Sequence, residues 1–76
     1  MEEKLRKKIQ EVKDLMASGK VSPYQIEMDT YRSLKQASLR SLRDGKADID
    51  HLQFRTIEIL SQWHDRHYHK YVDDHD

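Results

Sequence analysis

Histidine side chains are concentrated near the C-terminal end of this 76-residue chain. Four of the five histidines lie there, and they are His64, His67, His69 and His75. On a helix, His64 and His67 lie on one side because they are three positions apart, so both imidazoles can reach one metal ion. Zinc held by protein ligands alone needs about four donors. The pair is therefore an incomplete metal site, which donors from residues 73–75 or from a second chain would have to complete.

His67 also falls within the apolar stripe of the same expected helix. It lies one turn after Trp63 and one turn before Tyr71. A histidine in this position is either a boundary residue that hydrogen-bonds to a tyrosine or a carbonyl, or a proton-sensitive group. In the second interpretation burial favours the neutral imidazole, so mild acid would loosen this end of the protein. The histidine cluster is thus a hypothetical metal- or pH-responsive element.

Basic side chains dominate the segment from Thr30 to Arg43, which contains no acidic residue. Spacings of four, four and three place a set of polar side chains on one flank of a predicted helix: Arg32, Gln36, Arg40 and Arg43. Arginine binds phosphate oxygens and glutamine can read a base edge, so nucleic-acid binding is one hypothesis. The chain's formal net charge of zero argues against it. A solvated face is the more common explanation of such a flank, and an acidic protein surface is favoured over nucleic acid.

Catalytic motifs are missing from the sequence. The chain has no cysteine and two glycines, so it has no thiol nucleophile and no glycine-rich phosphate loop. A chain of this length also buries too little surface to enclose a deep substrate cleft. We therefore expect no enzyme activity, no cofactor and no small-molecule substrate.

The charges divide unevenly along the chain although they cancel overall. Residues 1–46 carry eleven Lys/Arg against seven Asp/Glu, whereas residues 47–76 carry three against seven. No apolar run approaches the length of a membrane span, and the lysine-rich start is unlike a secretory signal. The absence of cysteine favours an intracellular, cytoplasmic setting.

Apolar residues recur with helical period in three segments. The expected helices cover residues 2–18, 23–43 and 49–71, and residues 72–76 form a frayed tail. Gly19 and Gly45 each follow a predicted helix and begin matching four-residue turns, Gly-Lys-Val-Ser and Gly-Lys-Ala-Asp. Short turns between helices of similar length predict an antiparallel three-helix bundle that forms one domain, residues 1–76.

Large apolar side chains outside the expected core indicate where a partner binds. At 100° per residue, Tyr24, Met28 and Tyr31 fall on the core stripe of the second segment, whereas Ile26 points the other way. Phe54 likewise lies outside the stripe of the third segment. Aromatic anchors and arginines dominate binding energy at interfaces. The expected binding residues are therefore Ile26, Phe54, Trp63 and Tyr68, with Arg32, Gln36, Arg40 and Arg43 beside them.

These features together predict a small regulatory or adaptor protein that acts by binding another protein. Self-association as a homodimer satisfies the same pattern. Nucleic-acid binding through the basic flank is the main alternative, and a metal- or pH-responsive C-terminus is the third. No membrane partner is expected.

Overall fold

The computed structural model describes residues 2–72, and every regular element in that range is helical. The elements, in chain order, are α1 (Glu3–Ala17), α2 (Pro23–Asp29), α3 (Gln36–Arg43), the 3-10 turn η1 (Ile49–His51) and α4 (Phe54–Tyr71). The prediction of an all-α chain is thus confirmed for residues 2–72. None of these helices is long and apolar enough to cross a membrane.

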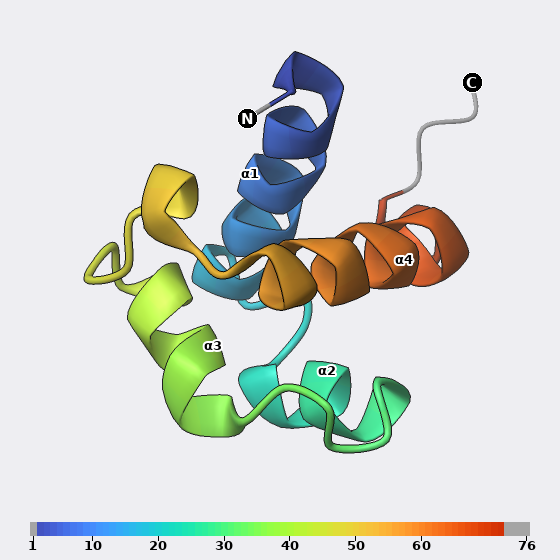
Figure 1. The fold of residues 1–76 in the computed structure, drawn as a ribbon. Helices are drawn as coiled ribbons and strands as arrows, with labels where there is room; N and C mark the ends of the chain where they lie inside the picture. Colours follow the sequence, from blue (N-terminus) through green and yellow to red (C-terminus); the bar gives the residue numbers. More distant parts are fainter. Residues whose placement is uncertain (1, 73–76) are drawn as a thin grey trace.

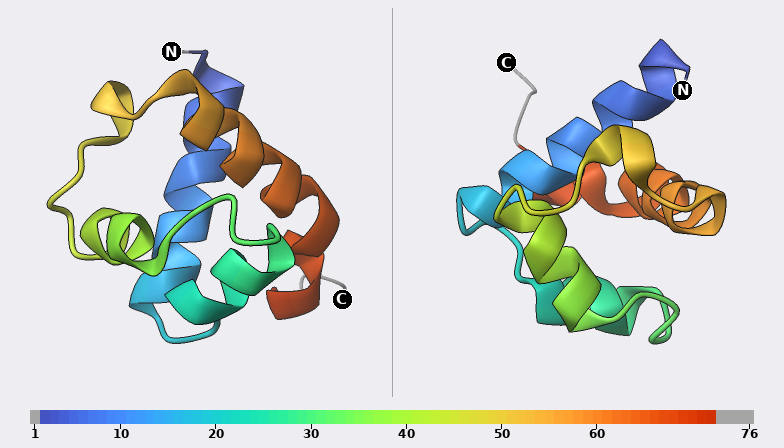
Figure 2. Two further views of the ribbon diagram at one scale, coloured as in Figure 1. Left: turned by 60° about the horizontal axis from the view of Figure 1, so that its bottom comes forward. Right: turned by 60° about the vertical axis from the view of Figure 1, so that its left-hand side comes forward.

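The two longest helices, α1 and α4, cross each other, and the shorter α2 and α3 lie on one side of that pair (Figure 1). In the left view of Figure 2 the loop between α2 and α3 passes near α4, and residues of this loop and of α4 line one pocket. Two polar contacts join α1 to α4 at their crossing, a 2.7 Å ion pair between Lys8 and Asp65 and a 2.7 Å contact between Glu11 and His64. The core between the helices is made of these side chains: Ile9, Val12, Leu15, Met16, Val21, Ile26, Leu34, Leu39, Leu42, Ile49, Ile57, Leu60 and Trp63.

The three-helix bundle prediction is wrong, because residues 2–72 form four α-helices. The expected helix 23–43 is divided into α2 and α3 by residues 30–35. Thr30 contributes to the break, since its hydroxyl donates to the carbonyls of Ile26 and Glu27 at 2.9 and 3.1 Å. Such back-bonding and the β-branched side chain both weaken helix continuation. The expected helix 49–71 is also interrupted, because extended backbone at Leu52 and Gln53 separates η1 from α4.

The matching turns predicted from the sequence do form the same structure. Gly19 and Gly45 have φ angles of 82° and 80°, which glycine adopts without the steric cost of a Cβ. The N–H of Gly19 donates to Met16 and that of Gly45 donates to Leu42. The next N–H in each turn donates to the carbonyl five residues back, from Lys20 to Leu15 and from Lys46 to Ser41. These bonds complete a Schellman motif at each helix end.

The break between α2 and α3 also changes which side of α2 is buried. Ile26 is fully buried, so the expectation that it is exposed for a partner is wrong. Tyr24, Met28 and Tyr31, expected in the core, are exposed. Because residues 30–35 separate α2 from α3, the side of α2 that faces the core is set independently of α3. Burying one branched aliphatic side chain and leaving two tyrosine hydroxyls in water avoids an unsatisfied polar group.

Candidate functional site

Three of the four large apolar side chains that residues 2–72 leave exposed lie on α2 or in the turn that follows it. Tyr24 is 56% exposed, Met28 39% and Tyr31 89%. Tyr24 and Met28 are four positions apart on α2, on the side opposite the buried Ile26, and Tyr31 follows in the turn after the helix. We call these three residues the α2 surface. Exposed apolar groups concentrated in one short segment indicate a candidate interaction site.

Tyr31 occupies a backbone conformation that its side chain disfavours. Its φ is 55° and that of Arg32 is 64°, so two consecutive non-glycine residues are left-handed. The N–H of Tyr31 donates to Met28 at 3.1 Å and that of Arg32 donates to Glu27 at 2.7 Å. This is the same Schellman motif that ends α1 and α3, with tyrosine at the position where both other helices have glycine. The left-handed conformation costs an L-residue roughly 1–2 kcal/mol.

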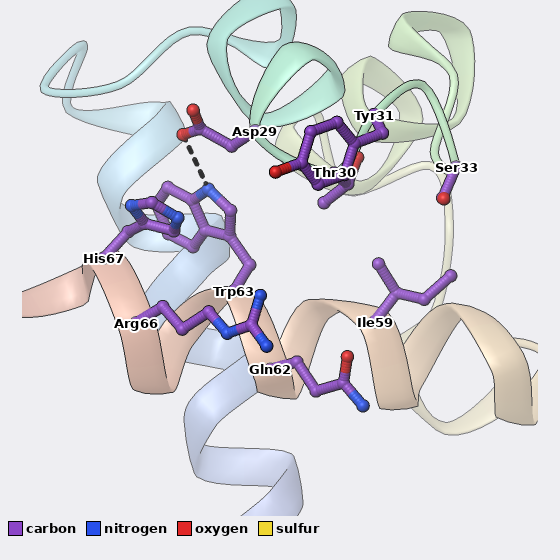
Figure 3. A pocket seen from close by; sticks show the side chains of 9 residues that line it. All are labelled: Asp29, Thr30, Tyr31, Ser33, Ile59, Gln62, Trp63, Arg66 and His67. Carbon is purple, nitrogen blue, oxygen red and sulfur yellow. Dashed lines mark hydrogen bonds between the residues drawn. The ribbon is translucent and has the colours of Figure 1, made fainter.

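A pocket of about 170 Å³ lies between the turn after α2 and the middle of α4 (Figure 3). From the α2 side it is lined by Asp29, Thr30, Tyr31 and Ser33. From α4 it is lined by Ile59, Gln62, Trp63, Arg66 and His67. Spacings of three, four, seven and eight put the α4 residues on one helix face. We call this hollow the α2–α4 pocket.

One hydrogen bond fixes the two walls of the pocket. The indole N–H of Trp63 donates to Asp29 Oδ2 at 3.0 Å (Figure 3). The other oxygen of Asp29 accepts from the amide of Gln25 at 2.9 Å. The Trp63 ring is held in turn by His67 and Tyr71, whose ring centroids are 5.5 and 5.8 Å away. The carboxylate thus positions the largest buried side chain of α4.

One guanidinium and one carboxylate line the pocket, those of Arg66 and Asp29. Arg66 forms none of the ion pairs or side-chain hydrogen bonds found among residues 2–72. The charge of Asp29 also acts on a neighbouring group, because burial, and secondarily this negative charge, raises the pKa of the Tyr71 hydroxyl above its ordinary value. Arg66 is thus a cation at the pocket that no carboxylate among residues 2–72 neutralises.

The residues expected to bind a partner do not gather in one place. Trp63 is 2% exposed and belongs to the core, so within residues 2–72 it reaches the surface only as the floor of the α2–α4 pocket. Tyr68 is half-buried on the other side of α4, where its hydroxyl donates to Glu11. Phe54 is exposed, as expected, but it begins α4 and does not line the pocket.

The basic flank predicted for one continuous helix does not exist in that form. Arg32 lies in the turn, whereas Gln36, Arg40 and Arg43 belong to α3. Their side chains are also engaged, because Gln36 donates to Glu27 at 3.0 Å and Arg40 donates to Gln36 at 2.9 Å. Arg43 binds Asp44, and this hydrogen bond lowers the pKa of that carboxyl. The helix break thus removes the alignment on which the phosphate-binding hypothesis depended.

The two histidines proposed as metal ligands have different surroundings. His64 stacks on Tyr68 with centroids 4.3 Å apart and contacts Glu11, whereas His67 packs against Trp63. Within residues 2–72, no three His, Cys, Asp or Glu side chains are grouped so that they could hold a metal ion. The donors expected from residues 73–75, and most of the predicted frayed tail, lie outside the described residues.

A second hollow of about 340 Å³ lies between α3 and the start of α4. Its walls are mainly the leucines 34, 39, 42, 52 and 60, together with Ala47 and the polar side chains of Ser38, Ser41, His51, Gln53 and Thr56. Its lining contains no Lys, Arg, Asp or Glu. This second hollow therefore provides mainly apolar area, with His51 as its titratable side chain.

Comparisons with protein-family models, with curated proteins and with solved structures return no match for this chain. The chemistry of the site itself is therefore the basis for a function: exposed aromatic rings, the Arg66 guanidinium, which has no ion pair among residues 2–72, and neutral hydrogen-bonding groups around a small pocket.

Sequence reasoning missed the exposure of Tyr24, Met28 and Tyr31 and the pocket residues Asp29, Gln62 and Arg66. The alignment of Gln62, Trp63 and Arg66 on one face of α4 was available from their spacing. The pairing of Trp63 with Asp29 was not, because 34 positions separate the two residues.

Proposed function

We propose that this chain is a small, non-enzymatic regulatory or adaptor protein that acts by binding another protein through the α2 surface and the adjoining α2–α4 pocket. The absence of cysteine supports an intracellular setting. The partner covers Tyr24, Met28 and Tyr31, which residues 2–72 leave in water.

The observation that carries this proposal is the conformation of Tyr31. The residue is 89% exposed, so its ring adds little to the packing within residues 2–72, yet its left-handed backbone costs stability. Glycine, which α1 and α3 use at the equivalent position, would remove that cost. Strain at an exposed aromatic side chain is typical of residues kept for binding.

A photo-crosslinking experiment tests the proposal. The crosslinking amino acid p-benzoylphenylalanine replaces Tyr24 in the full chain, and the labelled protein is irradiated in extract of the source organism. The same amino acid at Lys7, which is exposed on α1, is the matched control. We expect a discrete adduct from position 24 that is absent from position 7.

The same experiment is repeated with Tyr31→Gly added to each labelled chain. We expect the adduct at position 24 to disappear while the thermal unfolding midpoint is unchanged or higher. An adduct with twice the mass of the chain would identify a second copy as the partner. Equal adducts from both positions, no adduct, or an adduct that survives Tyr31→Gly would overturn the proposal.

A further inference from the structure

We infer that the α2–α4 pocket binds a side-chain carboxylate of an acidic segment on the partner protein, with Arg66 as the anion-binding group. This inference rests on the proposed function and adds the chemistry of the group that is recognised. It concerns a residue of α4, whereas the α2 surface proposal depends on Tyr31.

Arg66 differs from the other arginines of the chain in its surroundings. Arg6 pairs with Asp50, Arg40 donates to Gln36 and Arg43 pairs with Asp44. Of the arginines without a partner among residues 2–72, Arg66 is the one that lines this pocket. A guanidinium carries five N–H donors in a planar fork that matches a carboxylate, and Arg66 is exposed, so a ligand can reach it.

Neutral donors complete the site. Tyr31, Ser33 and Gln62 line the pocket, and their side chains make no hydrogen bond with other residues between 2 and 72. In Figure 3 these side chains and the Arg66 guanidinium border the same opening. A carboxylate accepts about four hydrogen bonds, so it can use the guanidinium and the neutral donors together.

The single carboxylate of the pocket does not oppose this assignment. Both oxygens of Asp29 already accept hydrogen bonds, from Trp63 and Gln25. Asp29 forms no ion pair with Arg66, so the guanidinium is available. Of the Lys, Arg, Asp and Glu side chains, those that line the pocket are Arg66 and Asp29, so their formal charges cancel. The attraction for an anion therefore comes from the Arg66 guanidinium itself, which forms no ion pair among residues 2–72.

The size of the pocket favours a side chain over a larger ligand. A volume of about 170 Å³ equals roughly five to six waters at ~30 Å³ each. This accommodates the end of an aspartate or glutamate side chain. The flat α2 surface beside it then receives the apolar neighbours of that residue, so one acidic group next to apolar residues is the expected motif.

An NMR titration of the ¹⁵N-labelled full chain tests this inference. The probe is N-acetyl-glutamate N-methylamide, its neutral isostere is N-acetyl-glutamine N-methylamide, and inorganic phosphate is the third ligand. The chain has one tryptophan, so the indole N–H of Trp63 gives a single resonance at the pocket. We expect the glutamate probe at millimolar concentration to shift this resonance and those of Tyr31 and Gln62, and the glutamine probe to leave them unchanged.

Matched variants on α4 assign the effect to one residue. Arg66→Gln should weaken binding of the glutamate probe by about tenfold. Arg55→Gln removes the same charge from an exposed position outside the pocket and should leave the affinity unchanged. Equal shifts with the glutamine probe, no shift at the pocket, stronger binding of phosphate, or the same affinity in Arg66→Gln would overturn the inference.

The two proposals fail separately. If Arg66→Gln leaves both the glutamate titration and the crosslink at position 24 intact, the carboxylate assignment is wrong and the protein-binding proposal stands. If the glutamate probe binds at Arg66 but the crosslink is absent, the pocket is an anion site and the α2 surface is not an interface.

Discussion

The indole N–H of Trp63 lies 3.0 Å from Asp29 Oδ2, and this hydrogen bond joins α4 to the end of α2. It is the polar contact that sets the shape of the α2–α4 pocket, because each partner lines one wall. It also explains why a buried tryptophan is acceptable here, since its only polar atom has an acceptor.

Replacing Trp63 by phenylalanine keeps an aromatic ring in the core and removes the N–H. We expect a loss of about 2 kcal/mol in unfolding free energy, because the hydrogen bond to a charged acceptor is lost and the indole is larger than the replacement. Chemical denaturation measures the change. Asp29→Asn retains an acceptor and should cost less. A loss below about 0.5 kcal/mol for Trp63→Phe would mean that the contact contributes little to stability.

Replacing Tyr31 by glycine should stabilise the chain or leave its stability unchanged. Glycine removes a left-handed penalty of roughly 1–2 kcal/mol, and its greater freedom in the unfolded state returns about 0.5–1 kcal/mol of that gain. Tyr31→Ala is the control, because it removes the exposed ring and keeps the backbone cost. Denaturant midpoints of both variants give the comparison. A large destabilisation by glycine, with alanine equally affected, would show that the ring packs against the chain.

Alanine at Gly19 or Gly45 should destabilise the protein by a similar amount, about 1 kcal/mol in each case. The left-handed penalty of roughly 1–2 kcal/mol is partly offset, by about 0.5–1 kcal/mol, because alanine has less conformational freedom than glycine in the unfolded state. A Cβ at Gly19 would meet nothing within 4 Å, and one at Gly45 would meet only Lys13 Nζ at 3.9 Å. The cost therefore comes from the positive φ angles and not from a collision. Thermal unfolding of the two variants tests this equality. Asparagine, which tolerates this region better, should recover part of the loss at both positions.

The ionisation of Tyr71 should occur above the ordinary pH range for tyrosine. Burial and the charge of Asp29 raise its pKa, so the folded state favours the neutral hydroxyl. The stabilisation that comes from keeping Tyr71 neutral is fully present below the pKa of about 10 that tyrosine has in the unfolded chain. It is lost as the pH rises through the higher pKa of Tyr71 in the folded protein. The phenolate absorbance of the wild type minus that of Tyr71→Phe isolates this group. Asp29→Asn should lower the pKa of Tyr71, and a difference curve centred at or below the ordinary value would contradict the prediction.

The local signals in the sequence located several helix ends correctly. Gly19 and Gly45 end α1 and α3, and α2 begins at Pro23, the predicted first residue of the second helix. These features depend on neighbouring residues, so composition and spacing are enough to predict them. The end of α2 was missed because its Schellman motif uses Tyr31 in place of glycine.

The candidate site depended on information that is not local. Helical periodicity assigned Ile26 to the surface and Tyr31 to the core. That assignment treated residues 23–43 as one continuous helix, with a single apolar face along its whole length. The break lets α2 take its own orientation, which buries Ile26 and exposes the tyrosines. Trp63 was predicted to bind a partner, whereas its buried position and its hydrogen bond to Asp29 depend on where α4 lies relative to the end of α2.

The sequence alone therefore determined that the chain is helical, where α1 and α3 end, and that its cysteine-free composition lacks the common catalytic motifs. These follow from backbone preferences and periodicity within a few residues. The tertiary structure decided which face of α2 is buried. It also decided which arginine lines a pocket without forming an ion pair among residues 2–72. The reason is that both depend on contacts between segments more than 30 positions apart, such as Asp29 and Trp63, whose pairing no local pattern specifies.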